Sequence, residues 1–240
     1  MVQNLIATQD LGAFIMGQLV GKGIARAFVR EACNVVIVGR NADRLQKAAR
    51  ELAQPGAEVV AIAADVTEEA QVKRVFAEAL ARFGRVDILV NSAGAFDGGP
   101  IDEIPLEAWQ RVIATNVTAA FLCIREAFPI MKKMGGGRVI NIGSISAQRT
   151  RENMAPYTTS KFAIWGLTQS AALEGREYGI AVSCLHPGNV LVERRAGVEE
   201  PMMSTEDIGR VALLMATLPP EVNVLETIVL PVTQKYLGRG

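Results

Sequence analysis

The chain has 240 residues, with 25 Lys and Arg against 25 Asp and Glu, so its formal net charge is zero. This balance gives no sign of the basic surface that a nucleic-acid-binding protein needs. Half of the residues are hydrophobic and only 5% are aromatic. Such an aliphatic interior is typical of parallel strands that are covered by helices on both faces.

No apolar run approaches the length of a membrane span, and the N-terminus lacks the basic segment and apolar core of a secretory signal. Cys33, Cys123 and Cys184 are scattered and odd in number, which favours reduced, buried thiols over disulfides. His186 is the only histidine and precedes Pro187, so we expect a structural role for it and no multi-histidine metal site. These features together predict a cytoplasmic protein without a metal.

Strand-like and helix-like segments alternate along the chain, without a break in composition or an internal repeat. Thr67 is a candidate N-cap, and the long central helix is expected to break near Thr115-Asn116. The pattern predicts a single domain over residues 1–240, an α/β fold with one doubly wound, Rossmann-like parallel sheet and helices on both faces. Strands are expected at 35–38, 59–62, 86–90, 138–142, 180–185 and 227–230, and helices at 43–53, 67–83, 106–134, 155–178 and 205–216.

Small or polar residues follow four of these strands: Asp65, Asn91 to Gly94, Ser144, and Pro187-Gly188. Any one of them alone is also compatible with an ordinary strand-terminating turn. In doubly wound sheets, however, ligands bind beyond the carboxyl ends of the strands. The coincidence of four such ends predicts a binding site at this edge.

Tyr157 and Lys161 are four residues apart, which places them on one face of a helix, one turn apart. Tyrosine ordinarily titrates near 10, and a nearby ammonium favours its ionised form. A hydroxyl such as that of Ser144 can hydrogen-bond a carbonyl oxygen that the tyrosine protonates. The trio therefore indicates proton transfer between a carbonyl and an alcohol, although a Tyr/Lys pair by itself often lies on a solvated helix face.

With these residues in place, the chain resembles the short-chain dehydrogenase/reductase family from about residue 21 to the C-terminus. The resemblance implies that Tyr157 is the acid/base, that Ser144 orients the substrate carbonyl, and that Lys161 assists the tyrosine and binds the nicotinamide ribose. Asn116 would hold a water of the proton relay. The motifs that carry the resemblance are Asn91-Ser92-Ala93-Gly94, where serine replaces a second asparagine, Thr115-Asn116-Val117, Gly143-Ser144-Ile145-Ser146-Ala147, Tyr157 with Lys161, and Pro187-Gly188.

The resemblance also implies a bound nicotinamide dinucleotide and a homodimer or homotetramer. Arg40 follows Gly39, which stands where an acid for the ribose 2′-hydroxyl is expected; an arginine here suits a 2′-phosphate, so we expect NADP(H) over NAD(H). The alternative is that Arg40 only caps the strand. The expected cofactor-binding residues are Gly17, Gly21, Gly23, Arg40, Asp65, Val66, Asn91, Ala93, Gly94, Tyr157, Lys161, Pro187, Gly188 and Val190.

The N-terminal part departs from the family, which opens with a strand and a Thr-Gly-x-x-x-Gly-x-Gly loop that approaches the pyrophosphate. If Gly21 is the last glycine of that loop, Ile15 and Leu19 occupy the other two positions, and their branched side chains should obstruct the pyrophosphate. The alternative register through Gly17, Gly21 and Gly23 shortens the following helix. Residues 6–14 are also a poor first strand. Three alternative explanations fit this departure: a rebuilt loop that still binds the cofactor, a loss of tight dinucleotide binding, or a local sequence error.

The segment at about 190–203 is expected to be a short substrate lid, and Val192 falls where the family often has Ser or Thr. The leading hypothesis is an NADP(H)-dependent oxidoreductase that interconverts a carbonyl compound and an alcohol. The alternative is a catalytically impaired binding or scaffold protein that kept the fold but lost a competent nucleotide loop.

Overall fold

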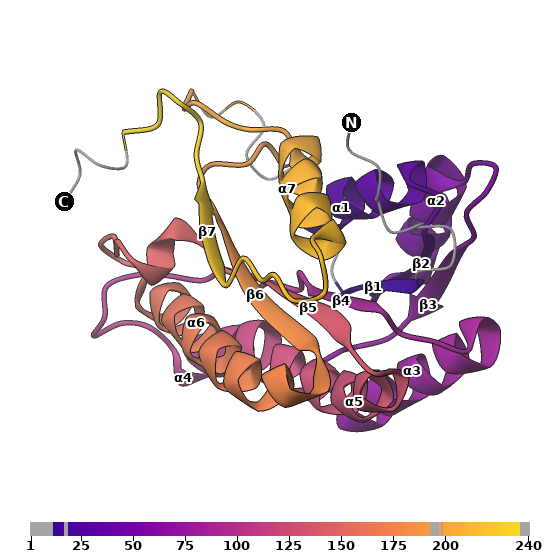
Figure 1. Cartoon of the computed structure of the whole chain (residues 1–240). Helices are drawn as coiled ribbons and strands as arrows, with labels where there is room; N and C mark the ends of the chain where they lie inside the picture. The colour runs from indigo at the N-terminus through magenta and orange to yellow at the C-terminus, as the bar shows by residue number, and fades with distance from the viewer. Residues whose placement is uncertain (1–11, 17–18, 193–196, 198, 236–240) are drawn as a thin grey trace.

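The computed structural model describes residues 12–16, 19–192, 197 and 199–235, and their centre is a parallel sheet (Figure 1). The sheet has seven strands in the order β3-β2-β1-β4-β5-β6-β7, and every neighbouring pair is parallel. This confirms the predicted doubly wound, Rossmann-like fold. The strands are β1 (Gly12–Met16), β2 (Asn34–Gly39), β3 (Val59–Ala63), β4 (Ile88–Asn91), β5 (Gly137–Ile142), β6 (Ile180–Pro187) and β7 (Glu226–Val229).

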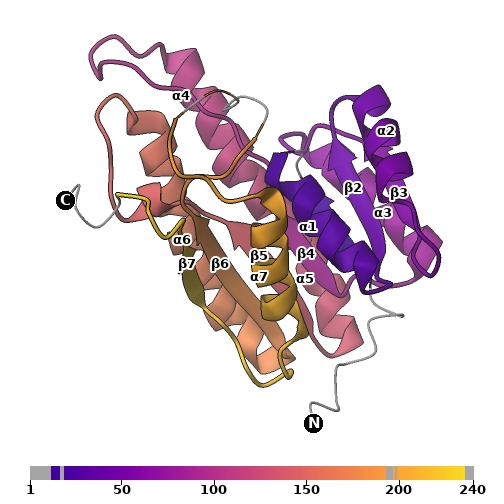
Figure 2. The ribbon, with the colours of Figure 1, turned by 90° about the horizontal axis from the view of Figure 1, so that it is seen from above.

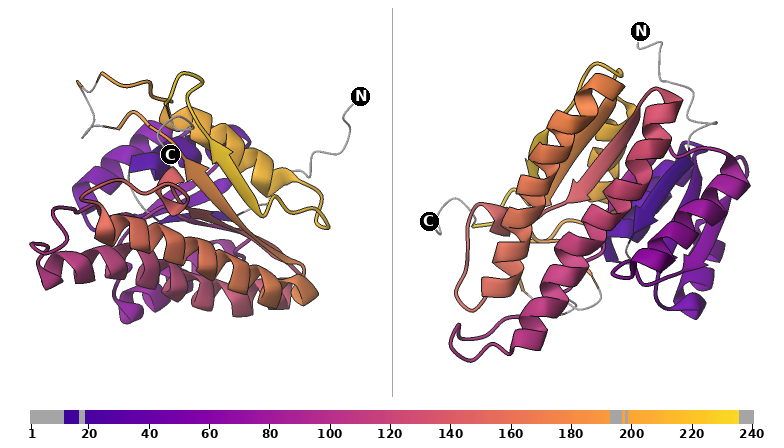
Figure 3. Two further views of the ribbon diagram at one scale, coloured as in Figure 1. Left: turned by 90° about the vertical axis from the view of Figure 1, so that its left-hand side faces the viewer. Right: turned by 90° about the horizontal axis from the view of Figure 1, so that it is seen from below.

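Helices cover both faces of this sheet. One layer holds α1, α2 and α7, with α1 and α7 side by side (Figure 2). The other layer holds α3 to α6, which run across the opposite face (Figure 3). The helices are α1 (Leu19–Arg30), α2 (Ala42–Leu52), α3 (Glu69–Phe83), α4 (Leu106–Ile113), α5 (Ala119–Met134), α6 (Ala155–Gly175) and α7 (Thr205–Thr217).

Two hydrophobic clusters lie between the sheet and its helical layers. Successive strand residues point to opposite faces. In β2, Val35 and Ile37 therefore join the cluster under α1, α2 and α7, whereas Val36 and Val38 join the one under α3 and α5. Since both faces of the sheet are covered, the strands are continuous aliphatic runs, as buried parallel strands require.

The first strand forms despite its weak sequence signal. Residues 12–16 pair with β2 on one side and with β4 on the other, and Ala13 and Ile15 are completely buried. Pairing on both edges overrides the low strand preference of the segment. The prediction that Thr67 caps α3 is wrong: the helix begins at Glu69, and the Thr67 hydroxyl donates to Asp65 Oδ1 at 2.7 Å.

The central helix changes its hydrogen-bond pattern where a break was predicted, but the chain stays helical through this point. α4 and α5 are joined by a π-helical turn at Ala114–Thr118, which contains Asn116. By length and hydropathy the combined segment Leu106–Met134 passes a test for a membrane span, contrary to the expectation from its apolar runs. In the fold, α5 packs against the sheet through Leu122, Ala127 and Met131, as a core helix of a globular domain does.

Candidate active site

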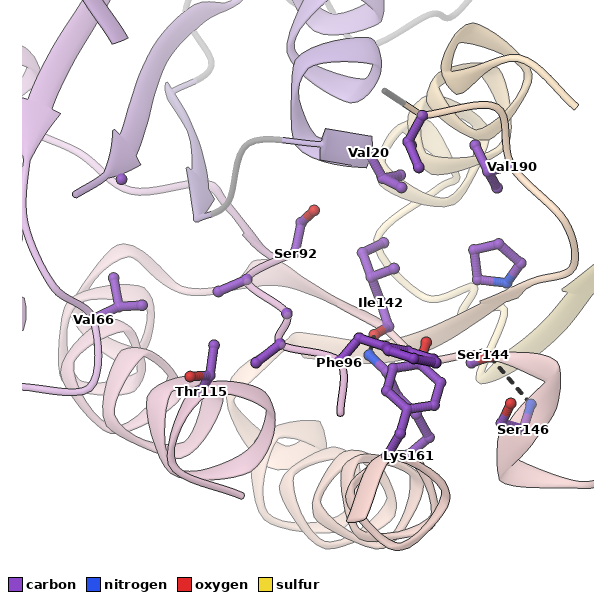
Figure 4. Close-up of a pocket in the computed structure, with 18 of the residues that line it drawn as sticks. Val20, Val66, Ser92, Phe96, Thr115, Ile142, Ser144, Ser146, Lys161 and Val190 are labelled. Atoms are coloured by element: carbon purple, nitrogen blue, oxygen red, sulfur yellow. Dashed lines mark hydrogen bonds between the residues drawn. The ribbon is translucent and has the colours of Figure 1, made fainter. Parts of the chain in front are cut away.

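A cleft of about 860 Å³ opens at the carboxyl edge of the sheet (Figure 4). This volume lies in the upper part of the range of small-molecule and cofactor sites, roughly 300–1,000 Å³. The four strand ends singled out in the sequence meet here. The lining includes Val20, Gly39, Arg40, Asp65, Val66, Ala93, Gly94, Phe96, Ser144, Ser146, Arg151, Met154, Tyr157, Lys161, Pro187, Gly188, Val190 and Val192.

Ser144 follows β5 directly and begins a short 3-10 turn. Its Oγ accepts a hydrogen bond from the Ser146 backbone N–H at 3.1 Å, which fixes the turn (Figure 4). The side chain of Ser144 is buried yet lines the cleft. The turn therefore presents the hydroxyl at a defined position toward a ligand.

Tyr157 and Lys161 reach the same end of the cleft from successive turns of α6. Lys161 is only 5% exposed, and its Nζ donates to the Ile142 carbonyl at 2.9 Å. The same Nζ lies 5.6 Å from the centre of the Tyr157 ring. On the other side, the Phe96 ring packs on Tyr157 with 5.2 Å between ring centres. The lysine is thus anchored by the strand end and held beside the tyrosine.

Asn116 lies behind this group and does not line the main cleft. Its Oδ1 accepts from the Ala95 N–H at 2.6 Å, and its Nδ2 donates to the Ala95 carbonyl at 3.0 Å and to Ser160 Oγ at 2.9 Å. Ser160 in turn donates to the Tyr157 carbonyl at 2.6 Å. Asn116 therefore connects the strand-end segment with α6, through Ser160, a residue that the sequence did not single out.

Arg40 and Asp65 lie at the opposite end of the cleft. The Arg40 side chain is 80% exposed, and its Nη1 lies 4.0 Å from Asp65 Oδ2. Partial burial raises the pKa of Asp65, but hydrogen bonds from Thr67 and the charge of Arg40 outweigh it, so this pKa lies below its usual value. A charged carboxylate and a largely free guanidinium are consequently available for a polar ligand.

Most of the other expected cofactor residues also line this cleft, namely Val66, Ala93, Gly94, Pro187, Gly188 and Val190. Asn91 does not: its amide donates to Asn141 Oδ1 at 2.8 Å inside the sheet edge. Gly17 lies outside the described residues.

The two remaining glycines are inside α1 and do not line the cleft. A Cβ on Gly21 would lie 3.2 Å from Ile15 Cγ2, so the glycine permits α1 to approach β1 closely. A Cβ on Gly23 would lie 2.3 Å from the Thr205 carbonyl oxygen of α7. Gly23 is thus a helix-packing residue, which corrects its expected place in the nucleotide loop.

Ile15 does not obstruct the cleft, contrary to the expectation from the glycine pattern. Its side chain is completely buried in the cluster between the sheet and α1, and it is not part of the cleft wall. Because β1 alternates its side chains, the residue at this position points into the core.

The cleft has polar side chains at both of its ends, Arg40 and Asp65 at one and Tyr157 with its neighbours at the other. Such a lining fits an elongated polar ligand such as a dinucleotide. Ser92 lines the middle of the cleft (Figure 4). Its Oγ is buried without a hydrogen-bond partner among the described residues and faces α1, 3.4 Å from the position of a Cβ on Gly21.

His186 is a buried neighbour of Ser144 whose contact the sequence did not reveal. Its ring is fully buried at the end of β6, and Nδ1 lies 3.2 Å from the Ser144 backbone N and 2.9 Å from the Ser144 carbonyl oxygen. Nε2 lies 3.3 Å from Glu226 Oε1 without the geometry of a hydrogen bond. Burial is the main cause that lowers the pKa of His186 below 6.5, so the neutral ring packs beneath the serine turn.

Comparison with known proteins agrees with this geometry. Residues 13–202 match the short chain dehydrogenase family. An uncharacterized oxidoreductase of Bacillus subtilis (strain 168) is 36% identical over 219 residues, which cover 91% of this chain and 81% of the relative.

Two solved structures share the fold. A short-chain type dehydrogenase/reductase from Mycobacterium ulcerans superposes with a TM-score of 0.90 at 27% identity, covering 94% of this chain and 90% of that one. An alcohol dehydrogenase from the archaeon Thermococcus sibiricus, complexed with 5-hydroxy-NADP, gives 0.84 at 26% identity, covering 93% and 97%. The chain therefore belongs to the short-chain dehydrogenase/reductase family and is an NAD(P)-dependent oxidoreductase.

Proposed function

We propose that the protein is an NADP(H)-dependent oxidoreductase that interconverts a carbonyl compound and an alcohol, with Tyr157 as acid/base. The observation that carries the proposal is the meeting of Ser144, Tyr157 and Lys161 at one end of a cleft whose other end holds Arg40. Neither end of the cleft alone defines the reaction. The end with Tyr157 supplies a proton donor for a carbonyl, and Arg40 supplies a positive charge that can bind the phosphate of a phosphorylated ribose.

A nicotinamide cofactor, when bound, would supply or accept the hydride at the substrate carbon. In the reductive direction, the Tyr157 hydroxyl gives its proton to the carbonyl oxygen as the new C–H bond forms. The Lys161 ammonium, 5.6 Å from the ring centre, stabilises the negative charge left on the phenolic oxygen. The Ser144 hydroxyl donates a hydrogen bond to the substrate oxygen and holds it toward Tyr157.

Asn116 contributes to this chemistry by positioning. It ties Ala95 to Ser160, and Ser160 holds the Tyr157 carbonyl, so the amide fixes α6 relative to the end of β4. Both the oxygen and the nitrogen of its side-chain amide bind protein groups, so a relay water would bind to the Asn116 backbone or to neighbouring groups.

Arg40 supports the preference for NADP(H). Its guanidinium is largely exposed just after β2, and Gly39 stands where an acid would bind a ribose 2′-hydroxyl and repel a 2′-phosphate. A planar guanidinium binds a phosphate through two parallel hydrogen bonds. The NADP-type ligand of the Thermococcus sibiricus enzyme is consistent with this assignment for the family.

The remaining features fit a cytoplasmic enzyme with one catalytic domain. Burial raises the pKa values of Cys33, Cys123 and Cys184 to about 12, so these thiols are inert and suit a reducing compartment. The lid at about 190–203 is held at its base, since the Leu191 N–H donates to the Met203 carbonyl at 2.8 Å.

A homodimer or homotetramer is supported by apolar side chains on α5 and α6. Phe121 and Phe162 are nearly half exposed on these two helices, where a second subunit would cover them. Trp165, in contrast, is partly buried against Ile164 and Cys184, so it belongs to the core of one subunit.

The proposal is tested by cofactor binding and turnover together. NADPH at about 100 times its Kd should stabilise the fold by about 2.7 kcal/mol in a thermal-shift titration, with a smaller effect of NADH at the same concentration. A panel of ketones and aldehydes should then oxidise NADPH. No shift at millimolar cofactor would instead support the scaffold hypothesis, which the family comparison does not favour.

A further inference from the structure

The end of the cleft next to Tyr157 carries a cation on its wall that has no ion-pair partner in the described part of the chain. Arg151 lines the cleft together with Met154 and Tyr157. Among the residues that the structure describes, no carboxylate lies within ion-pair distance of the Arg151 guanidinium, whereas Arg111 and Arg125 each pair with a carboxylate. Arg151 is exposed, so its charge is available to a ligand.

The segment that bears Arg151 is fixed beside the catalytic tyrosine. Thr150 Oγ1 lies 3.3 Å from Thr158 Oγ1, which connects the residue before Arg151 with the residue after Tyr157. The Gly99 N–H donates to the Asn153 carbonyl at 2.9 Å. These contacts hold the loop against both α6 and the segment that carries Phe96.

Charges are distributed unevenly along the cleft. Among the described residues, the only carboxylate in its lining is that of Asp65, which lies near Arg40 at the far end, where Arg44 also lines the cleft. The catalytic end has Arg151 and Lys161, and no described carboxylate lines it. Lys161 is buried, donates to the Ile142 carbonyl and lies beside Tyr157, so among the described residues of this end Arg151 is the exposed cation.

The other walls of this end are apolar. Phe96, Met154, Val190 and Val192 line it, and Phe96 packs on the Tyr157 ring. A substrate here meets a proton donor, an apolar surface and one guanidinium. Arginine binds carboxylates through a planar fork of two hydrogen bonds, which adds orientation as well as affinity.

We infer that the substrate is a carboxylate-bearing carbonyl compound, an oxo acid that is reduced to the corresponding hydroxy acid, and that Arg151 binds its carboxylate. This inference rests on the proposed function, since Tyr157 must act on the carbonyl. NADPH transfers a hydride to the carbonyl carbon, Tyr157 transfers a proton to the oxygen, and the products are NADP⁺ and the hydroxy acid. The carboxylate takes no part in the bond changes.

The test compares each acid with its neutral ester. Initial rates of NADPH oxidation are measured with acetoacetate and ethyl acetoacetate, and with levulinate and methyl levulinate, for the wild type, Arg151→Gln and Arg151→Lys. Arg149→Gln is the matched control, because Arg149 is exposed in the same loop but does not line the cleft. The NADPH thermal shift of every variant checks that fold and cofactor binding are intact.

We expect the wild type to prefer the acid of at least one pair. Arg151→Gln should lower kcat/KM for that acid by about 10- to 100-fold, as for the loss of hydrogen bonds to a charged group, and leave the ester within about twofold. Arg151→Lys should retain part of the preference, and Arg149→Gln all of it. The wild-type KM for the acid should also rise with ionic strength, since salt screens an exposed charge pair.

Two results overturn the inference and are distinguishable from failure of the proposed function. If esters are reduced but acids are not preferred, or if Arg151→Gln lowers both equally, Arg151 does not bind a carboxylate, although the carbonyl chemistry stands. If no acid, ester, ketone or aldehyde is reduced by a wild type that binds NADPH, the proposed function itself is wrong and this inference falls with it.

Discussion

The two ends of the cleft are built in different ways. At the end of the cleft near Tyr157, Ser144, Tyr157 and Lys161 are buried or half-buried. Each is held by a neighbour: Ser144 by the Ser146 N–H, Lys161 by the Ile142 carbonyl and Tyr157 by the Phe96 ring. At the nucleotide end, Arg40 is largely exposed and the glycines of α1 pack against Ile15 and α7 instead of lining the cleft. Under the proposed function, the chemistry would depend on residues that the fold holds in place, whereas cofactor choice would depend on exposed charge.

This contrast predicts that substitutions at the catalytic end change rate, whereas those at the nucleotide end change affinity or stability. The largest effect is expected at Lys161. Lys161→Met removes the ammonium beside Tyr157 and should lower kcat on the order of 10²- to 10⁴-fold, the usual contribution of acid–base machinery. Lys133→Met, at an exposed position of α5, is the control and should be silent. If the kcat of Lys161→Met stayed within tenfold of the wild-type value, the residues near Tyr157 would not control the rate as predicted.

The next effect is expected at Arg40. Arg40→Gln should weaken NADPH binding by about 10- to 100-fold, because hydrogen bonds to a phosphate are lost, and should change NADH binding far less. Isothermal titration with both cofactors measures the ratio. Arg50→Gln, on the exposed side of α2, serves as the control. Equal losses for the two cofactors would show that Arg40 only caps the strand.

Gly23 should affect stability rather than catalysis. Gly23→Ala forces a methyl group against the Thr205 carbonyl oxygen, so the free energy of unfolding should fall by about 1–3 kcal/mol. Gly166→Ala is the matched control: it lies in α6 with nothing within 4 Å of the added methyl, and should gain roughly 0.5–1 kcal/mol. Urea denaturation measures both variants. A Gly23→Ala variant that is as stable as the wild type but binds NADPH more weakly would show that Gly23 belongs to the nucleotide loop.

The smallest effect is expected at His186. Since burial lowers its pKa below 6.5, the unfolded chain takes up the proton before the native one does. The stability that this histidine confers is therefore present above about pH 6.5 and is lost as the pH falls through its native pKa. His186→Gln should flatten the acidic part of the curve of unfolding free energy against pH, and it removes the only histidine of the chain. An unchanged curve would show that the native ring titrates normally.

The sequence predicts the catalytic end better than the nucleotide end, for a physical reason. The Tyr157–Lys161 spacing is a property of the helix itself, and the ends of parallel strands necessarily share one edge of the sheet. The break at Asn116 is likewise local, and a π-helical turn occurs there. Such features can be predicted from the local sequence without knowledge of the tertiary contacts.

The remaining features depend on contacts between distant segments. β1 is a strand because β2 and β4 pair with it, and Gly23 is small because α7 crosses it. The contact of His186 with Ser144 joins residues 42 positions apart. The sequence around these positions gives no sign of the distant partner, so the spacing of the α1 glycines resembles a nucleotide loop although Gly21 and Gly23 serve helix packing.

The central claim is that the phenol of Tyr157 transfers the proton, and turnover by Tyr157→Phe tests it most directly. The variant keeps the ring that packs on Phe96 and loses only the hydroxyl. NADPH should stabilise it as it does the wild type, while carbonyl reduction falls by at least about 10²-fold. A Tyr157→Phe protein that binds NADPH and reduces the same substrate at the wild-type rate would contradict the account.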